Sequence, residues 1–354
     1  EELVQQTWTA TSSFALAVLF LAGAFGFLLA ARYRLLPRSG LAACAIGLVV
    51  VDLFAAGGGL NPTWDDPTIG FRHQPVIDFL KSQPGLFRID TVTGVEDVWQ
   101  PDTSVLEGIP SVWGLWNPFV LSDYYWLWKQ HIPGRSSPQY DVLNARYVLG
   151  HKDVVLDWEK FKPVYTEHPV VNIYENTRAM PRVFVVGRER RASSHDEALR
   201  HFTASDFDPR REVVVEGAEG PALPPQEGEV GRATVERYGP NGLTVRVEMD
   251  RPGYLVVSDV FYPGWEAWVD GRQTPVLRAN WTFRAVRLDP GAHVVEMRFR
   301  PRSFFIGLAI SGTAWGVVAL GAVMGLLRRR SALLQGKIRS QLLPEPLASR
   351  PPNR

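Results

Sequence analysis

The stretch that decides the fold is Tyr254–Ser311, which reads YLVVSDVFYPGWEAWVDGRQTPVLRANWTFRAVRLDPGAHVVEMRFRPRSFFIGLAIS. Its first part breaks into short segments of alternating apolar residues, which is typical of antiparallel β-strands joined by turns. Its end runs without a linker into an apolar segment, Phe304–Leu327, that holds 24 residues without a charge. The sequence therefore predicts a β domain joined directly to a membrane anchor, with function at a membrane surface.

We predict three transmembrane helices, over residues 12–31, 41–60 and 304–327. A helix rises about 1.5 Å per residue and the hydrocarbon core is about 30 Å thick, so each segment is long enough to cross it. The middle segment is the weakest, because it contains Asp52 and ends in three glycines. For each segment, and most of all for the middle one, the alternative is a buried helix of a soluble domain.

Basic residues set the predicted orientation. The loop at residues 32–40 carries three arginines, and residues 328–354 carry six arginines and one lysine. The positive-inside rule places both segments in the cytoplasm, so residues 61–303 lie outside. Three arginines pull the other way, because they flank the last span on its outer side: Arg298, Arg300 and Arg302. Charges in a long translocated domain have little effect on orientation, so we keep this prediction.

Composition excludes several classes of function. The net charge is +1, so nothing indicates a nucleic-acid partner. The single cysteine, Cys44, allows neither a disulfide framework nor a cysteine-based metal site. The chain begins with Glu1 directly before a long apolar run, which does not fit a signal peptide. We therefore interpret it as the C-terminal part of a longer membrane protein.

The predicted external region divides into two parts. Residues 61–210 are expected to form an α+β subdomain with a helix at 76–81 and four strands, in the segments LFRIDTV, LNARYVLG, VVNIYEN and PRVFVVG. Ser194 and Glu197 form a capping-box pattern that opens a further helix, on which His195 and His201 are expected to be exposed.

Residues 211–303 are expected to form an antiparallel β-sandwich. In LTVRVEM and HVVEMRFR apolar and polar residues alternate, as in strands with one buried face. The pairs Asp270-Gly271 and Pro290-Gly291 are turn signals between such strands.

The sequence names no catalytic residue and predicts no metal site. Six residues are candidates for substrate binding: Asp52, Trp113, Trp116, Trp126, Trp265 and Trp268. An ionisable group inside a span costs about 3 kcal/mol and usually faces a cavity or a partner, although a structural hydrogen bond is the simpler interpretation of Asp52. The tryptophans offer flat faces for sugar rings, or they belong to the core. Trp265 and Trp268 differ by three positions, so in a regular strand they face opposite sides.

Several blocks together resemble the YfhO family of bacterial membrane proteins. They occur in the family's order: VVDLF, LFRID, LNARYVL, the pair YEN and MPRVFVV, YPGWEAWVDG, and RANWTFRAVRLDPGAHVVEMRFRP before an apolar span. The family is regarded as similar to polytopic glycosyltransferases that use polyprenyl-phosphate sugars. Its members are linked to glycosylation of envelope polymers. Such enzymes carry an acidic catalytic residue in an early external loop, which this chain lacks.

The resemblance implies a multi-pass protein of the bacterial cell membrane, with the large domain extracytoplasmic and the C-terminus cytoplasmic. Its partners would be the lipid bilayer, a polyprenyl-phosphate sugar and an envelope polysaccharide. No cofactor is expected in this chain, although a divalent cation could serve the full-length parent. The leading hypothesis is the C-terminal part of a membrane glycosyltransferase, with the catalytic region elsewhere. The alternatives are a non-enzymatic glycan-binding or scaffold protein and a subunit of a lipid or polysaccharide transporter.

Overall fold

The computed structural model describes residues 21–57, 73–94, 99–100, 103–114, 120–224 and 226–342. The chain divides into two compact units, Glu1–Arg72 and His73–Arg354, which are described separately.

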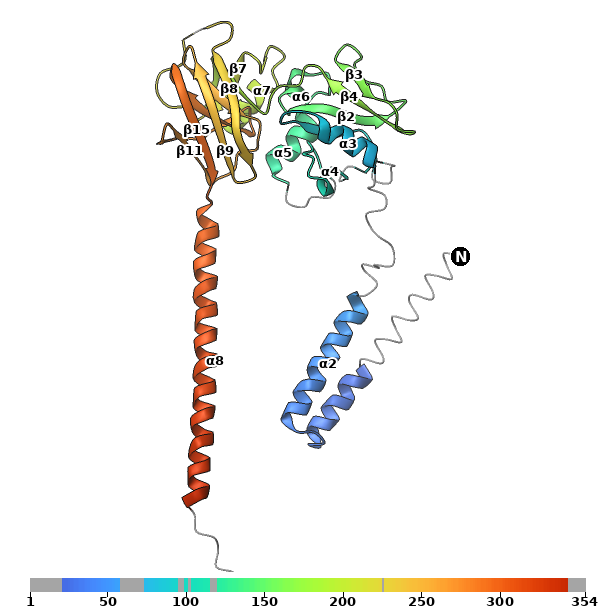
Figure 1. Ribbon diagram of the computed structural model, residues 1–354, viewed down its shortest axis with the longest axis vertical. Helices are drawn as coiled ribbons and strands as arrows, with labels where there is room; N and C mark the ends of the chain where they lie inside the picture. The colour runs from blue at the N-terminus through green and yellow to red at the C-terminus, as the bar shows by residue number, and fades with distance from the viewer. Residues whose placement is uncertain are drawn as a thin grey trace, which may run out of the picture. The chain divides into compact units, whose positions relative to one another are not determined.

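The first unit contains two apolar helices joined by a short loop (Figure 1). The apolar part of the first is Leu21–Arg32, and that of the second, α2 (Arg38–Gly57), is Ser39–Phe54. The helices approach closely at Gly23, where a side-chain Cβ would lie 3.3 Å from Leu48 Cδ1. As far as the described residues extend, both apolar parts are shorter than a membrane span. Residues 12–20 and 58–60 of the predicted spans lie outside the described residues, so three transmembrane helices are not confirmed.

The second unit ends in one long helix, α8 (Arg302–Leu342). Within the described residues, its segment Arg302–Gly325 is the one stretch long and apolar enough to cross a membrane. Its side chains are exposed throughout that stretch, unlike those of a core helix of a soluble protein. The helix predicted at 304–327 is therefore present, directly after the last strand.

The first sheet of this unit has four strands in the order β1-β2-β4-β3. These strands are β1 (Arg88–Thr91), β2 (Ala145–His151), β3 (Phe161–Tyr165) and β4 (Val171–Asn176). The pair β1–β2 is parallel, and the other pairs are antiparallel. An amphipathic helix, α3 (Gln74–Ser82), buries Val76, Ile77 and Leu80 in the same cluster as residues of β2 and β4. The helix and strands predicted in this region are thus observed.

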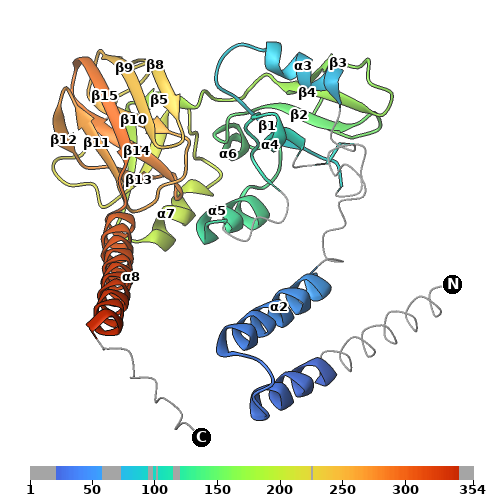
Figure 2. The same cartoon turned by 60° about the horizontal axis from the view of Figure 1, so that its bottom comes forward.

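Two further sheets follow (Figure 2), with strand orders β5-β10-β14-β13-β7-β6 and β12-β11-β15-β9-β8. The six-stranded sheet contains β5 (Val183–Val186), β6 (Arg188–Ala192), β7 (Glu212–Glu216), β10 (Gly253–Val257), β13 (Leu277–Ala279) and β14 (Phe283–Leu288). The five-stranded sheet contains β8 (Gly231–Gly239), β9 (Gly242–Met249), β11 (Trp265–Val269), β12 (Arg272–Thr274) and β15 (Gly291–Phe299). The five-stranded sheet is antiparallel throughout.

Strand β10 of the six-stranded sheet is buried on both faces. Leu255 and Val257 of β10 pack in one apolar cluster with residues of β9 and β15, so this cluster joins the two sheets. Tyr254 and Val256, which alternate with them, pack in the other cluster with α7 (His195–Phe202) and with residues of the four-stranded sheet. Strands buried on both faces lack polar alternation, as YLVV shows. This sheet also crosses the domain boundary that we predict at residues 210–211, because β5 and β6 belong to it.

Short helical segments connect these layers: α4 (Thr103–Leu106), α5 (Ser122–Trp126), η2 (Leu127–His131) and α6 (Pro138–Asp141). The segment η2 is a π-helix. This form is rare in proteins overall, but where it occurs it is often at a functional site. At the start of α7, Ser194 accepts a hydrogen bond from the Glu197 backbone N–H, as predicted. The Glu197 carboxylate bonds the backbone N–H of Ser193.

Candidate functional site

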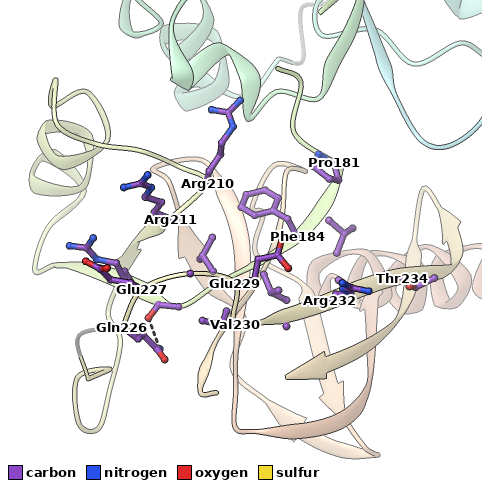
Figure 3. A pocket seen from close by; sticks show the side chains of 18 residues that line it. Pro181, Phe184, Arg210, Arg211, Gln226, Glu227, Glu229, Val230, Arg232 and Thr234 are labelled. Atoms are coloured by element: carbon purple, nitrogen blue, oxygen red, sulfur yellow. Dashed lines mark hydrogen bonds between the residues drawn. The ribbon is translucent and has the colours of Figure 1, made fainter. Parts of the chain in front are cut away.

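A large cavity lies where two sheet edges face each other (Figure 3). β5 is an edge strand of the six-stranded sheet, and β8 is an edge strand of the five-stranded sheet. The cavity between them has a volume of about 780 Å³ and is lined by all of β5 and the first residues of β8. Gln226 closes one end, where its Nε2 donates to the carbonyl oxygens of Gly187 and Pro252, each at 2.6 Å.

A second cavity of about 480 Å³ continues the first along the same two strands. The two cavities share Pro181, Val183 and Ala233 as lining residues. They therefore form one elongated depression, from Gln226 at one end to Tyr238 at the other, which we call the edge groove. An elongated, open groove suits a chain-like ligand better than a compact small molecule.

The edge groove is lined mainly by charged and aliphatic side chains. Its acidic residues are Glu227, Glu229 and Glu236, and its basic residues are Arg182, Arg188, Arg210, Arg211, Arg232 and Arg237. Six arginines and three glutamates line the groove, and Arg182, Arg210 and Arg211 also pair with aspartates just outside the lining. Figure 3 shows arginines on both sides of the strand that carries Phe184. The groove therefore favours ligands with anionic groups or many hydroxyl acceptors.

A buried charge centre adjoins the Tyr238 end of the groove, and strand pairing explains its position. Val257 of β10 pairs with Val183 of β5 and with Arg284 of β14. Arg182, next to Val183, and Arg284 therefore lie on either side of the chain that continues from Val257, and Asp259 lies between them. Its carboxylate oxygens are 3.1 Å from Arg182 Nη1 and 3.0 Å from Arg284 Nη2.

Two more side chains complete this centre, which we call the Asp259 hub. Arg88, at the start of β1, places its Nη2 2.7 Å from Asp259 Oδ1. The Tyr238 hydroxyl lies 3.0 Å from both carboxylate oxygens. Three guanidinium groups thus share one carboxylate, and the side chains of Arg182 and Arg284 are only 3% and 2% exposed. Two positive charges remain uncompensated within the hub, which strengthens the positive potential at the adjoining groove.

The pKa directions agree with this charge balance. Burial raises the pKa of Asp259, but the charges of Arg88, Arg284 and Arg182 oppose burial and hold the pKa below its usual value. Burial lowers the pKa of Arg284 to about 10, despite the attraction of Asp259. The Tyr238 hydroxyl has a raised pKa, chiefly because it is buried. All three groups therefore carry their ordinary charge at neutral pH.

A second buried carboxylate supports the other end of the groove. Asp141 lies 2.6 Å from Lys160 Nζ and 2.8 Å from Arg210 Nη2 through its two oxygens. Lys160 is fully buried, and burial lowers its pKa. Arg210 also lines the groove, so its ion pair with Asp141 holds one groove arginine in position. Asp141 is shared between two basic side chains, Lys160 and Arg210.

The hairpin between β13 and β14 has a strained backbone. Asn280 and Trp281 have φ values of 45° and 70°, in a region that non-glycine residues rarely occupy. Asn280 is held there because its N–H and Oδ1 bond the backbone of Val214, at 2.8 and 2.9 Å. Within the described residues, three buried polar atoms of this hairpin lack a hydrogen-bond partner: Asn280 Nδ2, Trp281 Nε1 and Thr282 Oγ1. Strain and unsatisfied polar groups are typical of functional sites, so this hairpin is a secondary candidate.

His195 differs from its predicted exposure. Its side chain is 35% exposed, stacks on Trp281 at 5.2 Å between ring centroids, and places Nδ1 3.0 Å from Glu216. Its Nε2 lies 3.4 Å from Asp123 of α5. A histidine at the first position of a short helix looks exposed in sequence, but the Trp281 hairpin packs against it. Among the described residues, no group of three acidic, histidine or cysteine side chains is arranged to hold a metal.

The predicted aromatic candidates fall in several places. Trp113 stacks on Trp128 at 6.3 Å and also contacts Tyr125, which in turn contacts Trp126. The structure therefore brings Trp113 and Trp126 together through Tyr125, with Trp126 42% exposed. Trp116 lies outside the described residues. These residues line neither cavity of the edge groove.

The two tryptophans of β11 point to opposite faces, as the spacing predicts. Trp265 faces inward, where its ring covers the Arg284 guanidinium at 3.7 Å. Trp268 lies on the other face, 5.3 Å from the Arg298 guanidinium. Asp52 is an exposed residue of α2 in the first unit. The structure therefore does not gather the six predicted residues into one site.

Comparison with models of known protein families gives a match to this chain. The family model described as bacterial membrane protein YfhO matches residues 230–311. The resemblance to the YfhO family is thereby confirmed. The YfhO match spans β8 to the first turns of α8, so it includes one wall of the edge groove and the junction with the helix. It supports localisation in a bacterial membrane; multi-pass topology and sidedness stay predictions. No curated protein and no solved structure matches the chain.

Sequence reasoning missed the Asp259 hub, although a signal was present. Each of its arginines lies in a block that carries the YfhO resemblance: Arg88 in LFRID, Arg182 in MPRVFVV and Arg284 in NWTFRAVRL. Asn144, in LNARYVL, accepts a hydrogen bond from Arg182 Nε at 2.9 Å. Arginines inside apolar strand patterns are a usable signal, because a buried charge requires a partner.

Proposed function

We propose that this chain is the C-terminal part of a YfhO-like membrane glycosyltransferase-type protein. In this proposal the parent transfers sugars from a polyprenyl-phosphate carrier to a cell-envelope polymer, and the edge groove holds that polymer as the acceptor. The observation that carries the proposal is an elongated groove lined by six arginines, on a domain joined to an apolar helix by two residues.

The groove has the chemistry that a polymer acceptor needs. Guanidinium groups donate several hydrogen bonds in a fixed plane, which suits hydroxyl, carboxylate and phosphate oxygens. Arg211 and Arg232 present such groups from opposite sides of β5 (Figure 3). Binding through several weak contacts along a chain also permits the polymer to slide between transfers, since no single contact is deep.

The proposed topology is the one that the sequence predicts. Spans at 12–31, 41–60 and 304–327 hold residues 61–303 outside the cell membrane, and residues 328–354 lie in the cytoplasm. The catalytic acid, and any divalent cation, belong to the part of the parent that precedes this chain. In support, α8 begins two residues after β15, so the groove-bearing domain cannot move far from the membrane.

The alternative is a non-enzymatic glycan-binding or scaffold protein. Trp268 favours this alternative, since its ring lies on the outer face of the five-stranded sheet and is partly exposed. An aromatic ring beside Arg298 and Glu296 is a common arrangement for binding a single sugar ring. Under this alternative the polymer binds without being modified.

One experiment separates these functions. The native protein carries Arg211→Gln and Arg232→Gln in its own host, and two quantities are measured: the sugar content of the envelope polymer and the polymer retained by the purified protein. The matched control is Arg272→Gln, an exposed arginine of β12 outside the groove. We expect both quantities to fall at least severalfold in the groove variant and to remain unchanged in the control.

Other outcomes have distinct meanings. Loss of retained polymer with normal sugar content favours the binding or scaffold alternative. Normal values of both quantities, with a normal amount of protein in the membrane, overturn the groove as the polymer site. The intact mass of the native protein provides an independent check, because a mass near 39.6 kDa would leave no room for a catalytic region upstream.

A further inference from the structure

The junction between the β domain and α8 is short and tightly packed. β15 ends at Phe299 and α8 begins at Arg302. The Arg300 N–H donates to the Gly264 carbonyl oxygen at 2.7 Å. Gly264 has a φ of 112°, and a Cβ there would lie 2.8 Å from the Pro301 Cα, so only glycine fits. The loop before β11 is therefore fixed against the first residues of the helix.

This packing sets the depth of the junction in a membrane. The uncharged segment of α8 begins at Phe304, and its length of about 36 Å fills a hydrocarbon core of about 30 Å. Arg300 and Arg302 lie four and two residues before Phe304, respectively, at the level of the lipid headgroups. Because Gly264 contacts Pro301, the neighbouring Tyr262 lies close to the same level.

The exposed side chains near this junction are of two kinds, aromatic and basic, and we call this group the collar: Tyr262, Arg300, Arg302, Phe304 and Phe305. The three aromatic side chains are 46%, 61% and 53% exposed in that order, and both arginines are exposed. Among the described residues, no acidic side chain forms an ion pair with Arg300 or Arg302. Exposed aromatic rings and unpaired arginines at a span end match the headgroup region, where aromatic residues anchor and arginines bind phosphates.

We propose that the collar binds the phosphate groups of anionic phospholipids and thereby holds the β domain on the membrane surface. Arginine binds phosphate oxygens through two parallel hydrogen bonds, which zwitterionic headgroups satisfy less well because their own ammonium group competes. The proposal explains why arginines flank the span on the side where the positive-inside rule does not expect them. It does not depend on the edge groove or on glycosyl transfer.

Depth is tested with a spin label on the full chain. Cys44, the single cysteine, is replaced by serine, and a label is attached at Tyr262→Cys or at the control position Gln273→Cys, an exposed residue of β12. The protein is reconstituted in phosphatidylcholine vesicles that contain phosphatidylglycerol. We expect the label at residue 262 to be accessible to oxygen, which concentrates in lipid, and inaccessible to a water-soluble paramagnetic relaxation agent. The label at residue 273 should show the opposite accessibilities. A water-exposed label at both positions overturns the proposal.

Lipid choice is tested by counting bound lipids. The full chain in mixed micelles of phosphatidylcholine and phosphatidylglycerol is released into a mass spectrometer, and the ratio of the two retained lipids is measured. Each arginine near an anionic surface contributes about 1 kcal/mol, which corresponds to about fivefold. We therefore expect Arg300→Gln and Arg302→Gln each to lower the phosphatidylglycerol preference up to fivefold, while Arg272→Gln leaves it unchanged.

Two outcomes would contradict the collar as a phospholipid site. An unchanged phosphatidylglycerol preference in the double variant Arg300→Gln/Arg302→Gln removes the arginines from lipid recognition. A preference that appears only when a polyprenyl phosphate is added identifies the carrier lipid, and not bulk phospholipid, as the ligand. The secondary-structure content of each variant, measured in the same micelles, confirms that the comparison is made between folded proteins.

Discussion

Asp259 and Asp270 are two carboxylates of the same pair of sheets, and their surroundings differ sharply. The side chain of Asp259 is 16% exposed and contacts three arginines and a tyrosine. That of Asp270 is 48% exposed and pairs with His293 at 2.7 Å in the turn between β11 and β12. Both form ion pairs at similar distances. The contribution of each carboxylate to stability therefore depends on its burial and on how many charged groups it neutralises, and not on whether it forms an ion pair at all.

The comparison also separates two roles of charge. Asp259 connects Arg88 of the four-stranded sheet, Arg284 of the six-stranded sheet and Tyr238 of the five-stranded sheet, so its loss would affect how these sheets meet. Asp270 lies in the turn between β11 and β12 and contacts the neighbouring strand β15, through His293 and through the backbone N–H of Val294, which donates to it at 2.8 Å. The first carboxylate is a tertiary element, and the second is a local one.

The largest effect is expected for Asp259→Asn. This change leaves three guanidinium groups, two of them almost fully buried, without a carboxylate, and breaking a buried pair costs about 3–5 kcal/mol. The midpoint of unfolding of the full chain in detergent micelles should fall accordingly, and Asp270→Asn is the matched control. A loss below about 1 kcal/mol, the range of surface pairs, would contradict the difference between the two carboxylates.

Acid provides a second measure of the same centre. The pKa of Asp259 is lowered in the folded protein, so its contribution is fully present above the unfolded value of about 3.9. It is lost as pH falls through the folded pKa, because the unfolded chain then binds the proton more readily. In Asp259→Asn this part of the acid sensitivity should be absent.

A smaller effect is expected for Arg284→Met, which tests the charge surplus. The change removes one bond to Asp259 and the contact with the Trp265 ring, but it also removes one of three mutually repelling cations. Its aliphatic replacement fills part of the same volume between the sheets. We expect a destabilisation of about 1–2 kcal/mol, clearly below that of Asp259→Asn. Equal losses for the two variants would show that the hub carries no surplus of positive charge.

The strands around these centres were predictable, because alternation in LTVRVEM and HVVEMRFR directly reflects which face is buried. The Asp270 turn was predictable for the same reason, since an Asp-Gly pair provides the positive φ values that it requires, 50° and 79°. Local sequence was sufficient in both cases.

The sites that depend on distant residues were not predictable. Arg88 and Arg284 are far apart in the chain and meet at Asp259 only because two different sheets pack together, which a single sequence does not reveal. Trp281 occupies a backbone conformation that favours glycine, so its sequence contains no turn signal. The edge groove arises because β5 joins a sheet made mostly of later strands, across the boundary that the sequence indicated.

Tyr238→Phe should have a third, smaller effect. The Tyr238 hydroxyl lies 3.0 Å from both oxygens of Asp259, and its removal deletes one hydrogen-bond donor to a carboxylate that keeps its arginines. Such a loss is worth about 1 kcal/mol. Tyr262→Phe, which changes an exposed hydroxyl, is the matched control and should change stability by less than half as much. A loss as large as that of Asp259→Asn would mean that the hydroxyl, and not the arginines, satisfies the carboxylate.

The smallest effect is expected at the exposed pair. The hydrogen bond to Asp270 raises the pKa of His293 above its usual value of about 6.5. A raised folded pKa contributes stability that is fully present below the unfolded pKa and is lost as pH rises through the folded one. Because Asp270 is about half exposed, the contribution should be only about 0.3–0.5 kcal/mol. His293→Gln should therefore lower stability slightly near pH 5 and leave it unchanged near pH 9. A loss of stability that persists at the higher pH would show that hydrogen bonds of the neutral imidazole, and not its charge, account for the effect. One such bond joins His293 Nε2 to the Asp289 carbonyl oxygen at 3.0 Å.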